Sequence, residues 1–300
     1  MPATMAESKS RAHKTIGITL GDAAGIGPEV IRGALESGSV DSDFTYRILG
    51  NADGVTPGKP CPETARDALA TLEEAARLAL TGEIAAVVTG PIHKARMQAV
   101  GFKFPGQTEF FANRWGTADF AMLLTGGALT VALVTAHVPL AEVPGLVTGQ
   151  EIMRVGRLLA DFLRLRTGRL PRIAVAGLNP HAGEDGVLGS EEGRVIAPAV
   201  AGLASGGIAE WTGPVSPDTV FNRAAVGEFD GVLCMYHDQG LIPLKLHAFD
   251  QGVNVTLGLP HIRTSPDHGT AFDIAGTGRA RADSMIAAIN LAAELVKKRA

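Results

Sequence analysis

Short apolar segments alternate with longer amphipathic segments along this chain. Five of the short segments are partly β-branched and bounded by Gly, Pro, Asn or His, which is the pattern of buried strands. They span residues 15–20, 85–89, 129–135, 173–176 and 231–235. Strands that alternate with helices predict an α/β protein whose mostly parallel sheet is covered by helices on both faces.

Two helices have the clearest amphipathic pattern. The first spans residues 151–165, and Thr148 with Glu151 forms a capping-box pattern at its start. Its apolar stripe consists of Ile152, Val155, Leu159 and Phe162. The second runs from about residue 284 to residue 299, with Asp283 as its expected N-cap. Its apolar face consists of Met285, Ile289, Ala292 and Val296.

The composition narrows the class of protein. Of the 300 residues 46% are hydrophobic, which excludes a disordered chain, and the net charge of −4 gives no reason to expect nucleic-acid binding. No run of ~18 apolar residues occurs, so no membrane span is expected. Residues 1–14 are polar and lack the apolar stretch of a signal peptide, so we predict a loose tail and a cytoplasmic protein. Cys61 and Cys234 lie outside any CxxC pattern, and a reduced state is favoured over one disulfide.

Three histidines each follow a predicted strand. His137, His181 and His237 come after the third, fourth and fifth of the apolar segments. The carboxyl ends of parallel strands meet at one edge of a sheet, where ligands bind, so these side chains can converge. Three neutral imidazoles suit a catalytic divalent metal, which can lower the pKa of a substrate alcohol. Their spacing matches no short metal signature, so capping, packing or titration remains the alternative role.

Two further segments lie at predicted strand ends. The glycine-rich loop 21–29 has Pro28 where a helix would begin, but it is neither GxGxxG nor a P-loop. A structural turn and a ligand-contacting loop are therefore both open for it. Lys94 could contact an anion, or it could simply be solvated. Gln107 and Thr108 offer hydrogen bonds at a predicted helix start, where capping is the alternative.

The C-terminal third carries more polar chemistry. Lys245 and Arg263 bring positive charge, and an arginine can hold a phosphate or carboxylate with two parallel hydrogen bonds. Surface salt bridges are the alternative role for both. Residues 268–270 precede a predicted helix and could bind a dinucleotide through backbone donors.

Five long segments, in order, resemble one enzyme family. They are GDAAGIGPEV, VTGPIHKARMQAVGFKFPGQTEFFA, GLNPHAGEDG, MYHDQGLIPLK and GVNVTLGLPHIRTSPDHGTAFDIAG. The family is 4-hydroxythreonine-4-phosphate dehydrogenase of pyridoxal phosphate biosynthesis, and the resemblance runs from about residue 15 to the C-terminus. It implies an isocitrate/isopropylmalate-dehydrogenase-like fold, in which residues 15–300 form a single catalytic unit of two intertwined α/β lobes with a central cleft. It also implies a homodimer with the active site at the subunit interface.

The resemblance assigns roles to individual residues. The metal ligands fall on His137, His181 and His237, and in this family one ligand comes from the partner subunit. The contacts to a small phosphorylated substrate fall on Gln107, Thr108, Lys245, Asn254 and Arg263. The cofactor loop falls on Asp267, His268, Gly269 and Thr270. The implied cofactors are NAD or NADP and one divalent ion, namely zinc, magnesium, manganese or cobalt, and three imidazoles favour zinc or another transition ion.

The implied reaction oxidises 4-phosphohydroxy-L-threonine at C3 and then loses CO2, giving 3-amino-2-oxopropyl phosphate. Lys245 and Asp238 are the candidate acceptors for the alcohol proton. Relatives that oxidise 4-phospho-D-threonate or 4-phospho-D-erythronate provide the main alternative, and an aromatic cis-dihydrodiol dicarboxylate is a further one. A phosphate acyltransferase of the same fold and a non-catalytic binding protein are more distant alternatives.

The chain departs from the family pattern at four places. Gln107 stands where the family usually has histidine, and glutamine can donate a hydrogen bond but cannot carry a proton or charge. This substitution leaves the choice between the amino acid and its hydroxy-acid analogue open. His93 replaces a usual asparagine, Ala23 stands where proline is common, and the stretch 51–62 is short.

Overall fold

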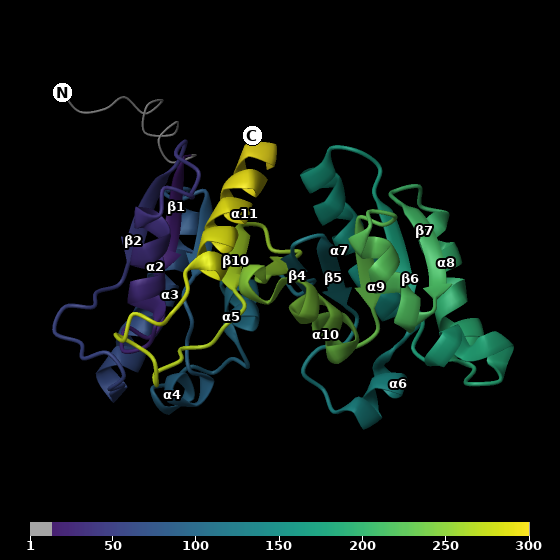
Figure 1. Cartoon of the computed structure of the whole chain (residues 1–300), viewed down its shortest axis with the longest axis horizontal. Helices are drawn as coiled ribbons and strands as arrows, with labels where there is room; N and C mark the ends of the chain where they lie inside the picture. The colour runs from purple at the N-terminus through teal and green to yellow at the C-terminus, as the bar shows by residue number, and fades with distance from the viewer. Residues whose placement is uncertain (1–13, 300) are drawn as a thin grey trace. The chain divides into compact units, whose positions relative to one another are not determined.

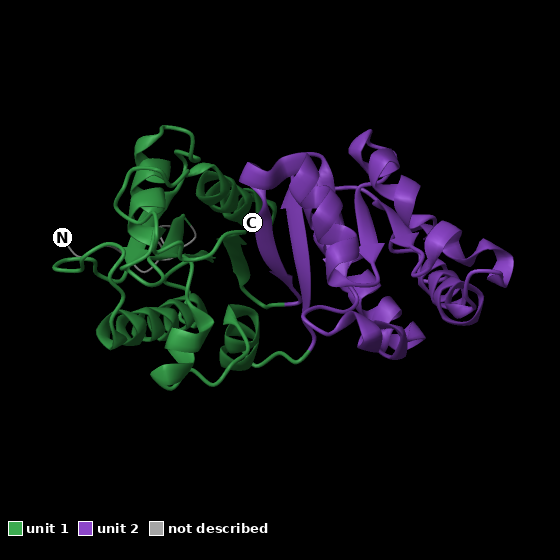
Figure 2. Ribbon diagram, turned by 60° about the horizontal axis from the view of Figure 1, so that its bottom comes forward, with its two compact units in different colours: residues 1–118, 259–300 green, residues 119–258 purple. Residues whose placement is uncertain are grey.

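The computed structural model describes residues 14–299. They divide into two compact units (Figure 2). Unit 1 combines the chain up to Ala118 with the chain from Leu259 onward, and unit 2 is Asp119–Gly258. The loose tail predicted for residues 1–14 lies outside the described residues except for Lys14. Within residues 14–299, no helix combines the length and the apolar character needed to cross a membrane.

The strands of unit 1 form a parallel arrangement in the order β2-β1-β3-β10 (Figure 1). Their bounds are β1 Thr15–Thr19, β2 Thr45–Leu49, β3 Ala86–Thr89 and β10 Ile262–Pro266. The helices are α2 Gly27–Glu36, α3 Pro62–Leu80, α4 Lys94–Ala99, α5 Gln107–Arg114 and α11 Asp283–Arg299. Helix α3 packs on β1, and α11 packs on β10 and beside α2, so apolar stripes of long helices bury the strands.

Unit 2 has the strand order β9-β4-β5-β8-β6-β7. The pairs on both sides of β4 are antiparallel, and those from β5 to β7 are parallel. The bounds are β4 Ala121–Gly126, β5 Leu129–Leu133, β6 Arg172–Ala176, β7 Glu210–Val215, β8 Gly231–Cys234 and β9 Val253–Leu257. The helical segments are η1 Leu140–Glu142, α6 Val143–Leu146, α7 Gly149–Thr167, η2 Pro180–Gly186, η3 Glu192–Ile196, α8 Ala197–Ala204, α9 Pro217–Ala225, α10 His237–Ala248 and η4 Phe249–Gln251.

Helices cover both faces of the strands in unit 2. Val232 and Cys234 belong to a buried apolar cluster that includes Leu241 and Leu244 of α10. The preceding residue, Gly231, faces α7, because an added Cβ would lie only 2.8 Å from Leu163 Cδ1 of that helix. Because successive residues of a strand point to opposite faces, β8 is buried on both sides, as a continuous apolar strand predicts.

All five predicted strands and both predicted helices are present. Helix α7 has Thr148 as its N-cap, whose hydroxyl accepts from the Glu151 backbone N–H, while the Glu151 carboxylate pairs with Arg154. Helix α11 begins at Asp283, one residue before the predicted start. The apolar residues predicted to face the core on these two helices are buried.

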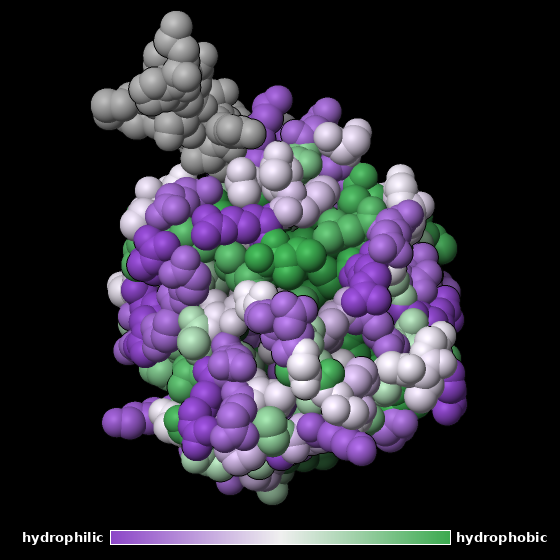
Figure 3. Space-filling view, turned by 90° about the vertical axis from the view of Figure 1, so that its left-hand side faces the viewer, coloured by the Kyte–Doolittle hydropathy of each residue, from purple (hydrophilic) through white to green (hydrophobic). Residues whose placement is uncertain are grey.

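The strands β2, β4, β7, β9 and β10 were not predicted from the sequence. The most informative case is β10, which is buried along its whole length although it contains Arg263, Thr264 and Ser265. Because β10 contains polar residues, it does not form the kind of apolar run that predicts a buried strand. The burial of these polar residues depends on hydrogen bonds to distant segments. At the other end of this unit's strand order, β2 is mostly exposed. Figure 3 views unit 1 from the side of β2 and shows apolar residues in a band between hydrophilic ones.

Candidate functional site

The glycine-rich loop of unit 1 packs against the loop that the resemblance assigns to the cofactor. Residues 21–27 are all buried. Ile26 N–H donates to the Thr270 carbonyl at 2.9 Å, and Asp22 N–H donates to the Pro91 carbonyl at 3.0 Å. A Cβ on Gly25 would lie 2.7 Å from the Thr270 oxygen, which is closer than real Cβ atoms approach. The glycine-rich loop is therefore a support for residues 267–270.

If residues 267–270 bind NAD(P), as the resemblance implies, Gly25→Ala is expected to raise the KM for that cofactor about tenfold, because the new methyl group would push the Thr270 backbone out of place. The KM for the phosphorylated substrate should change little. The matched control is Gly33→Ala, whose added Cβ would meet Ala282 at an ordinary 3.5 Å. Steady-state kinetics with each substrate varied in turn measures both constants. Equal cofactor KM values for the two variants would contradict the supporting role.

Residues 267–270 are followed by turns, not by a helix. The prediction of a helix directly after residues 268–270 is wrong, because residues 272–278 form turns and α11 begins only at Asp283. His268 is largely buried, and burial lowers its pKa. Its Nε2 atom is buried and has no hydrogen-bond partner within residues 14–299. An unsatisfied buried nitrogen is costly, so this atom is suited to meet a polar group of a ligand.

Arg263 is the centre of a second cluster in unit 1. Its side chain is only 4% exposed, and its Nη2 donates to the Thr89 hydroxyl at 2.7 Å and to Gln107 Oε1 at 3.4 Å. Gln107 Nε2 donates to the Gly90 carbonyl at 3.1 Å, so both ends of this amide are engaged. Burial lowers the pKa of Arg263 to about 10, while the charge of Glu109 acts in the opposite direction. Arg263 is therefore still a cation at neutral pH, and the surface salt bridge considered for it is wrong.

Helix α5 begins beside this cluster. Gln107 and Thr108 are its first two residues, as predicted, but its N-cap is Gly106 and no side chain caps it. The capping role considered for Gln107 and Thr108 is therefore wrong. His93, by contrast, caps α4, because its Nδ1 accepts from the Arg96 backbone N–H. This contact explains how histidine can replace the asparagine usual at that position, since asparagine is a favoured N-cap.

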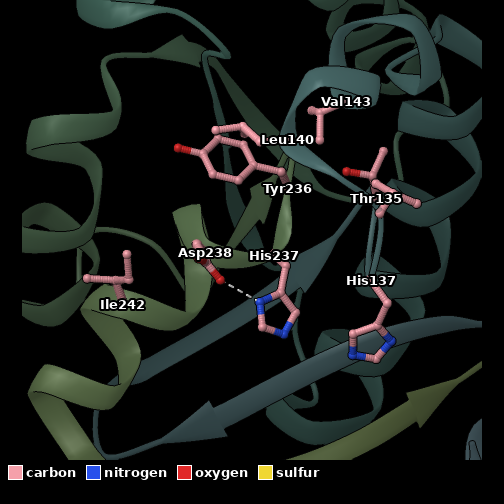
Figure 4. A pocket seen from close by; sticks show the side chains of 9 residues that line it. Thr135, His137, Leu140, Val143, Tyr236, His237, Asp238 and Ile242 are labelled. Carbon is pink, nitrogen blue, oxygen red and sulfur yellow. Dashed lines mark hydrogen bonds and ion pairs between the residues drawn. The ribbon is translucent and has the colours of Figure 1, made fainter.

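Two of the three candidate metal ligands lie together in unit 2. His137 follows β5, and His237 is the first residue of α10 after β8, the parallel neighbour of β5. Their ring centroids are 5.4 Å apart, and both rings line a cavity of about 420 Å³ (Figure 4). His237 Nδ1 is 2.7 Å from Asp238 Oδ1. A carboxylate on Nδ1 orients the ring and leaves Nε2 for a ligand.

His181 lies on a separate loop after β6 and does not line this cavity. It begins a run of five residues with φ between 42° and 79°, four of which are not glycine. Such left-handed backbone costs energy and persists only where other contacts hold it. The His181 side chain is 63% exposed, and its Nδ1 atom lies 4.0 Å from Asp218 Oδ2.

The loop before His181 is held by the buried carboxylate of Glu192, which the sequence does not mark as part of the site. Glu192 is 4% exposed, and its Oε1 accepts from the backbone N–H groups of Leu178 and Asn179 at 2.8 and 2.7 Å. Its Oε2 accepts from Asn179 Nδ2 at 3.0 Å. The only signal in the sequence is an acidic residue a short distance after the loop, which gives no hint of burial.

The remaining candidates are divided between the units. Lys245 lies about two turns after His237 on α10, and Asp238 is largely exposed beside His237. Asn254 lies in β9, and its buried Oδ1 has no hydrogen-bond partner in the described part of the chain. These three residues and the three histidines belong to unit 2, whereas Gln107, Thr108, Arg263 and residues 267–270 belong to unit 1.

Residues 17–292 match the family described as pyridoxal phosphate biosynthetic protein PdxA. The chain belongs to this family. A 4-hydroxythreonine-4-phosphate dehydrogenase of Desulfosudis oleivorans is 45% identical, with 92% of this chain and 94% of the relative covered. The crystal structure of the enzyme of that name from Klebsiella pneumoniae has a TM-score of 0.80 at 39% identity, and covers 94% of this chain and 99% of its own.

More distant structures confirm the predicted fold class. A β-decarboxylating dehydrogenase of Thermococcus kodakarensis, 18% identical, has a TM-score of 0.55, with 94% of this chain and 83% of that chain covered. Membership of the PdxA family, and not fold likeness, sets aside the acyltransferase alternative, because one fold serves unrelated chemistries.

The residues present fit a divalent metal in part. The adjacent rings of His137 and His237 provide two imidazole donors at one cavity, which is the donor chemistry that zinc and other transition ions favour. Within residues 14–299 of one chain, no group of three or more His, Cys, Asp or Glu side chains is arranged to hold a metal. A metal site in this PdxA family member would therefore need a third donor from elsewhere.

Proposed function

We propose that this chain is an NAD(P)-dependent 4-hydroxythreonine-4-phosphate dehydrogenase that works in the cytoplasm. The observation that carries the proposal is the near full-length match to the PdxA family and to relatives of that name. The paired rings of His137 and His237 at the ends of neighbouring parallel strands support it. Ligands bind at such strand ends in α/β proteins.

The proposed reaction has two steps. NAD(P), when bound, would supply the acceptor for the hydride that C3 of 4-phosphohydroxy-L-threonine loses, while a base of the chain takes the hydroxyl proton. The bond from C2 to the carboxylate then breaks, CO2 departs, and the electron pair on C2 takes up a proton to give 3-amino-2-oxopropyl phosphate. A divalent ion held by His137, His181 and His237 would stabilise negative charge on the C3 oxygen in both steps.

The chain's own residues would bind and orient the substrate. We assign its anionic groups to Arg263, Lys245 and Asn254, and further polar contacts to Gln107, which bonds Arg263, and to Thr108. Arg263 is a buried cation whose Nη2 donates to two neutral acceptors, Thr89 and Gln107, and a guanidinium can also hold an anionic group through charge-assisted hydrogen bonds. Lys245 and Asp238 are our candidates for the base, as both lie on α10 within about two turns of His237.

The third metal donor suggests a dimer. We propose that His181 reaches the metal of the partner subunit in a homodimer. Ile242 and Leu246 form an exposed apolar stripe on α10, with exposed fractions of 66% and 89%, and Phe249, 76% exposed, follows directly in η4. The spacing of four residues places Ile242 and Leu246 on one face of the helix, and Ile242 also lines the histidine cavity. A second copy of this chain that covered the stripe would approach the cavity.

Leu246→Lys is expected to weaken association of two chains, raising the dissociation constant at least about tenfold, because burial of a charge replaces burial of a leucine. Val226→Lys is the matched control, since Val226 is 77% exposed but lies outside the stripe. Analytical ultracentrifugation over a range of protein concentrations measures the constant. Unchanged association of the Leu246 variant would contradict the proposed interface.

A hydroxy-acid substrate is the second candidate, because Gln107 leaves the choice between it and the amino acid open. The neutral amide contacts Gly90 and Arg263 and can donate a hydrogen bond, but it cannot carry a charge toward the substrate. We therefore keep 4-phospho-D-threonate and 4-phospho-D-erythronate beside 4-phosphohydroxy-L-threonine.

The decisive experiment follows the absorbance of reduced nicotinamide with each of these three substrates, with NAD and with NADP, before and after removal of metal. We expect the highest kcat/KM with 4-phosphohydroxy-L-threonine and a strong dependence on added divalent ion. A higher value with either hydroxy acid would transfer the proposal to that substrate. No turnover of any of them, with metal present, would refute the dehydrogenase assignment.

A further inference from the structure

Gln239 joins two of the loops that carry histidines. It lies in the first turn of α10, two residues after His237, and is only 7% exposed. Its Oε1 accepts from the Met235 backbone N–H at 2.6 Å, and its Nε2 donates to the Gly177 carbonyl at 2.6 Å. Met235 ends the approach to His237, and Gly177 begins the loop that leads to His181.

This contact extends the pairing of two strands. The parallel pairing of β6 with β8 ends at Val175 and Leu233. Beyond that pair, the side-chain amide of Gln239 stands between Met235 and Gly177. A primary amide offers one carbonyl and an N–H donor, as a peptide group does, so it can bridge two chains that no longer bond to each other directly.

The other side of the His237 approach is held as well. The Met235 carbonyl accepts from the Thr135 backbone N–H at 3.2 Å and from the Thr135 hydroxyl at 2.8 Å. Thr135 lies two residues before His137. Thr135 and Gln239 therefore connect Met235, which follows β8, to the ends of its neighbours β5 and β6. Through Met235, the segments that lead to the three histidines are joined.

We propose that Gln239 is a positioning residue that holds two loops in place, the His237 loop toward this chain's own metal site and the His181 loop toward the partner's, and thereby tunes metal affinity. This inference rests on the proposed function, because it takes these histidines as metal ligands. Gln239 does not touch the metal or the substrate; it acts through the backbone of the two loops. Because its Cα belongs to the same helical turn as His237, a shift at the amide is passed on to the imidazole.

Two substitutions separate the hydrogen bonds from the packing. Gln239→Met has a similar size and loses both bonds. Gln239→Glu keeps an acceptor for Met235 but sets a carboxylate against the Gly177 carbonyl, which repels it. Each is expected to weaken Zn²⁺ binding about tenfold, the low end of the effect of residues that orient metal ligands. Gln239→Asn keeps the amide on a shorter side chain and should fold most readily, with a smaller loss.

The experiment measures Zn²⁺ affinity of the full-length protein by competition with a chromophoric chelator, and urea unfolding of the same samples. The matched control is Gln150→Glu, at an exposed position in the first turn of α7. We expect kcat to fall in the Gln239 variants while the KM for the phosphorylated substrate stays the same. Folded variants that bind Zn²⁺ as tightly as the unaltered protein, even if less stable, would overturn the inference alone. Failure of the unaltered protein to bind Zn²⁺ would overturn the proposed metal site and the inference with it.

Discussion

Replacing His237 with alanine is expected to lower kcat/KM at least about 100-fold, because the metal supplies several kcal/mol of stabilisation to negative charge in the transition state. His237 is the ligand best placed for this test, since its ring faces His137 across 5.4 Å and its Nδ1 is already held by Asp238. The residual activity should no longer respond to a chelator. Turnover of reduced nicotinamide and Zn²⁺ binding, measured on the same protein, check both parts.

The control for this variant is His247→Ala. His247 is an exposed histidine of the same helix, whose Nε2 accepts from the Ala128 backbone N–H. It lies outside the cavity formed around His137 and His237, so its loss should leave turnover and chelator sensitivity unchanged. Near-normal, chelator-insensitive turnover in His237→Ala would show that the metal assignment is wrong.

Arg263→Gln is expected to raise the KM for the phosphorylated substrate about 100-fold, with a smaller change in kcat. Hydrogen bonds to charged groups are worth about 1.5–3 kcal/mol each, and loss of two corresponds to that factor or more. Glutamine can still bond to Thr89 and Gln107, the acceptors of Arg263 Nη2. Folding should survive, because a neutral side chain replaces a cation that burial disfavours, which offsets the loss of its interaction with the charge of Glu109.

The matched control for Arg263→Gln is Arg66→Gln. Arg66 is an exposed arginine of unit 1 that pairs with Glu63 one turn earlier on α3, and such exposed pairs contribute little. Substrate saturation curves at a fixed, saturating cofactor concentration measure the effect. If Arg263→Gln changed only the cofactor KM, the assignment of Arg263 to the substrate would be wrong, and the residue would belong with loop 267–270.

The local pattern of the sequence was enough to predict the fold class. Buried parallel strands such as β1, β3 and β8 are short apolar runs, and α7 and α11 are long amphipathic helices, so each carries its signal within a few consecutive residues. The five motifs were likewise sufficient to point to the family that the chain belongs to. The order of the strands in each unit does not follow from such local signals. Nor does the return of the chain to unit 1 at Leu259.

The site depended on both levels. The sequence by itself placed His137 and His237 at the ends of strands, and a parallel sheet then allows them to converge. Only the tertiary structure decided that β5 and β8 are neighbours, that the two rings meet, and that His181 lies on a separate left-handed turn. Burial of Arg263 in β10 and the bridge made by Gln239 were also decided there. The physical reason is that a polar residue is buried only where distant segments supply its hydrogen-bond partners. The residues next to it along the chain do not show which segments these will be.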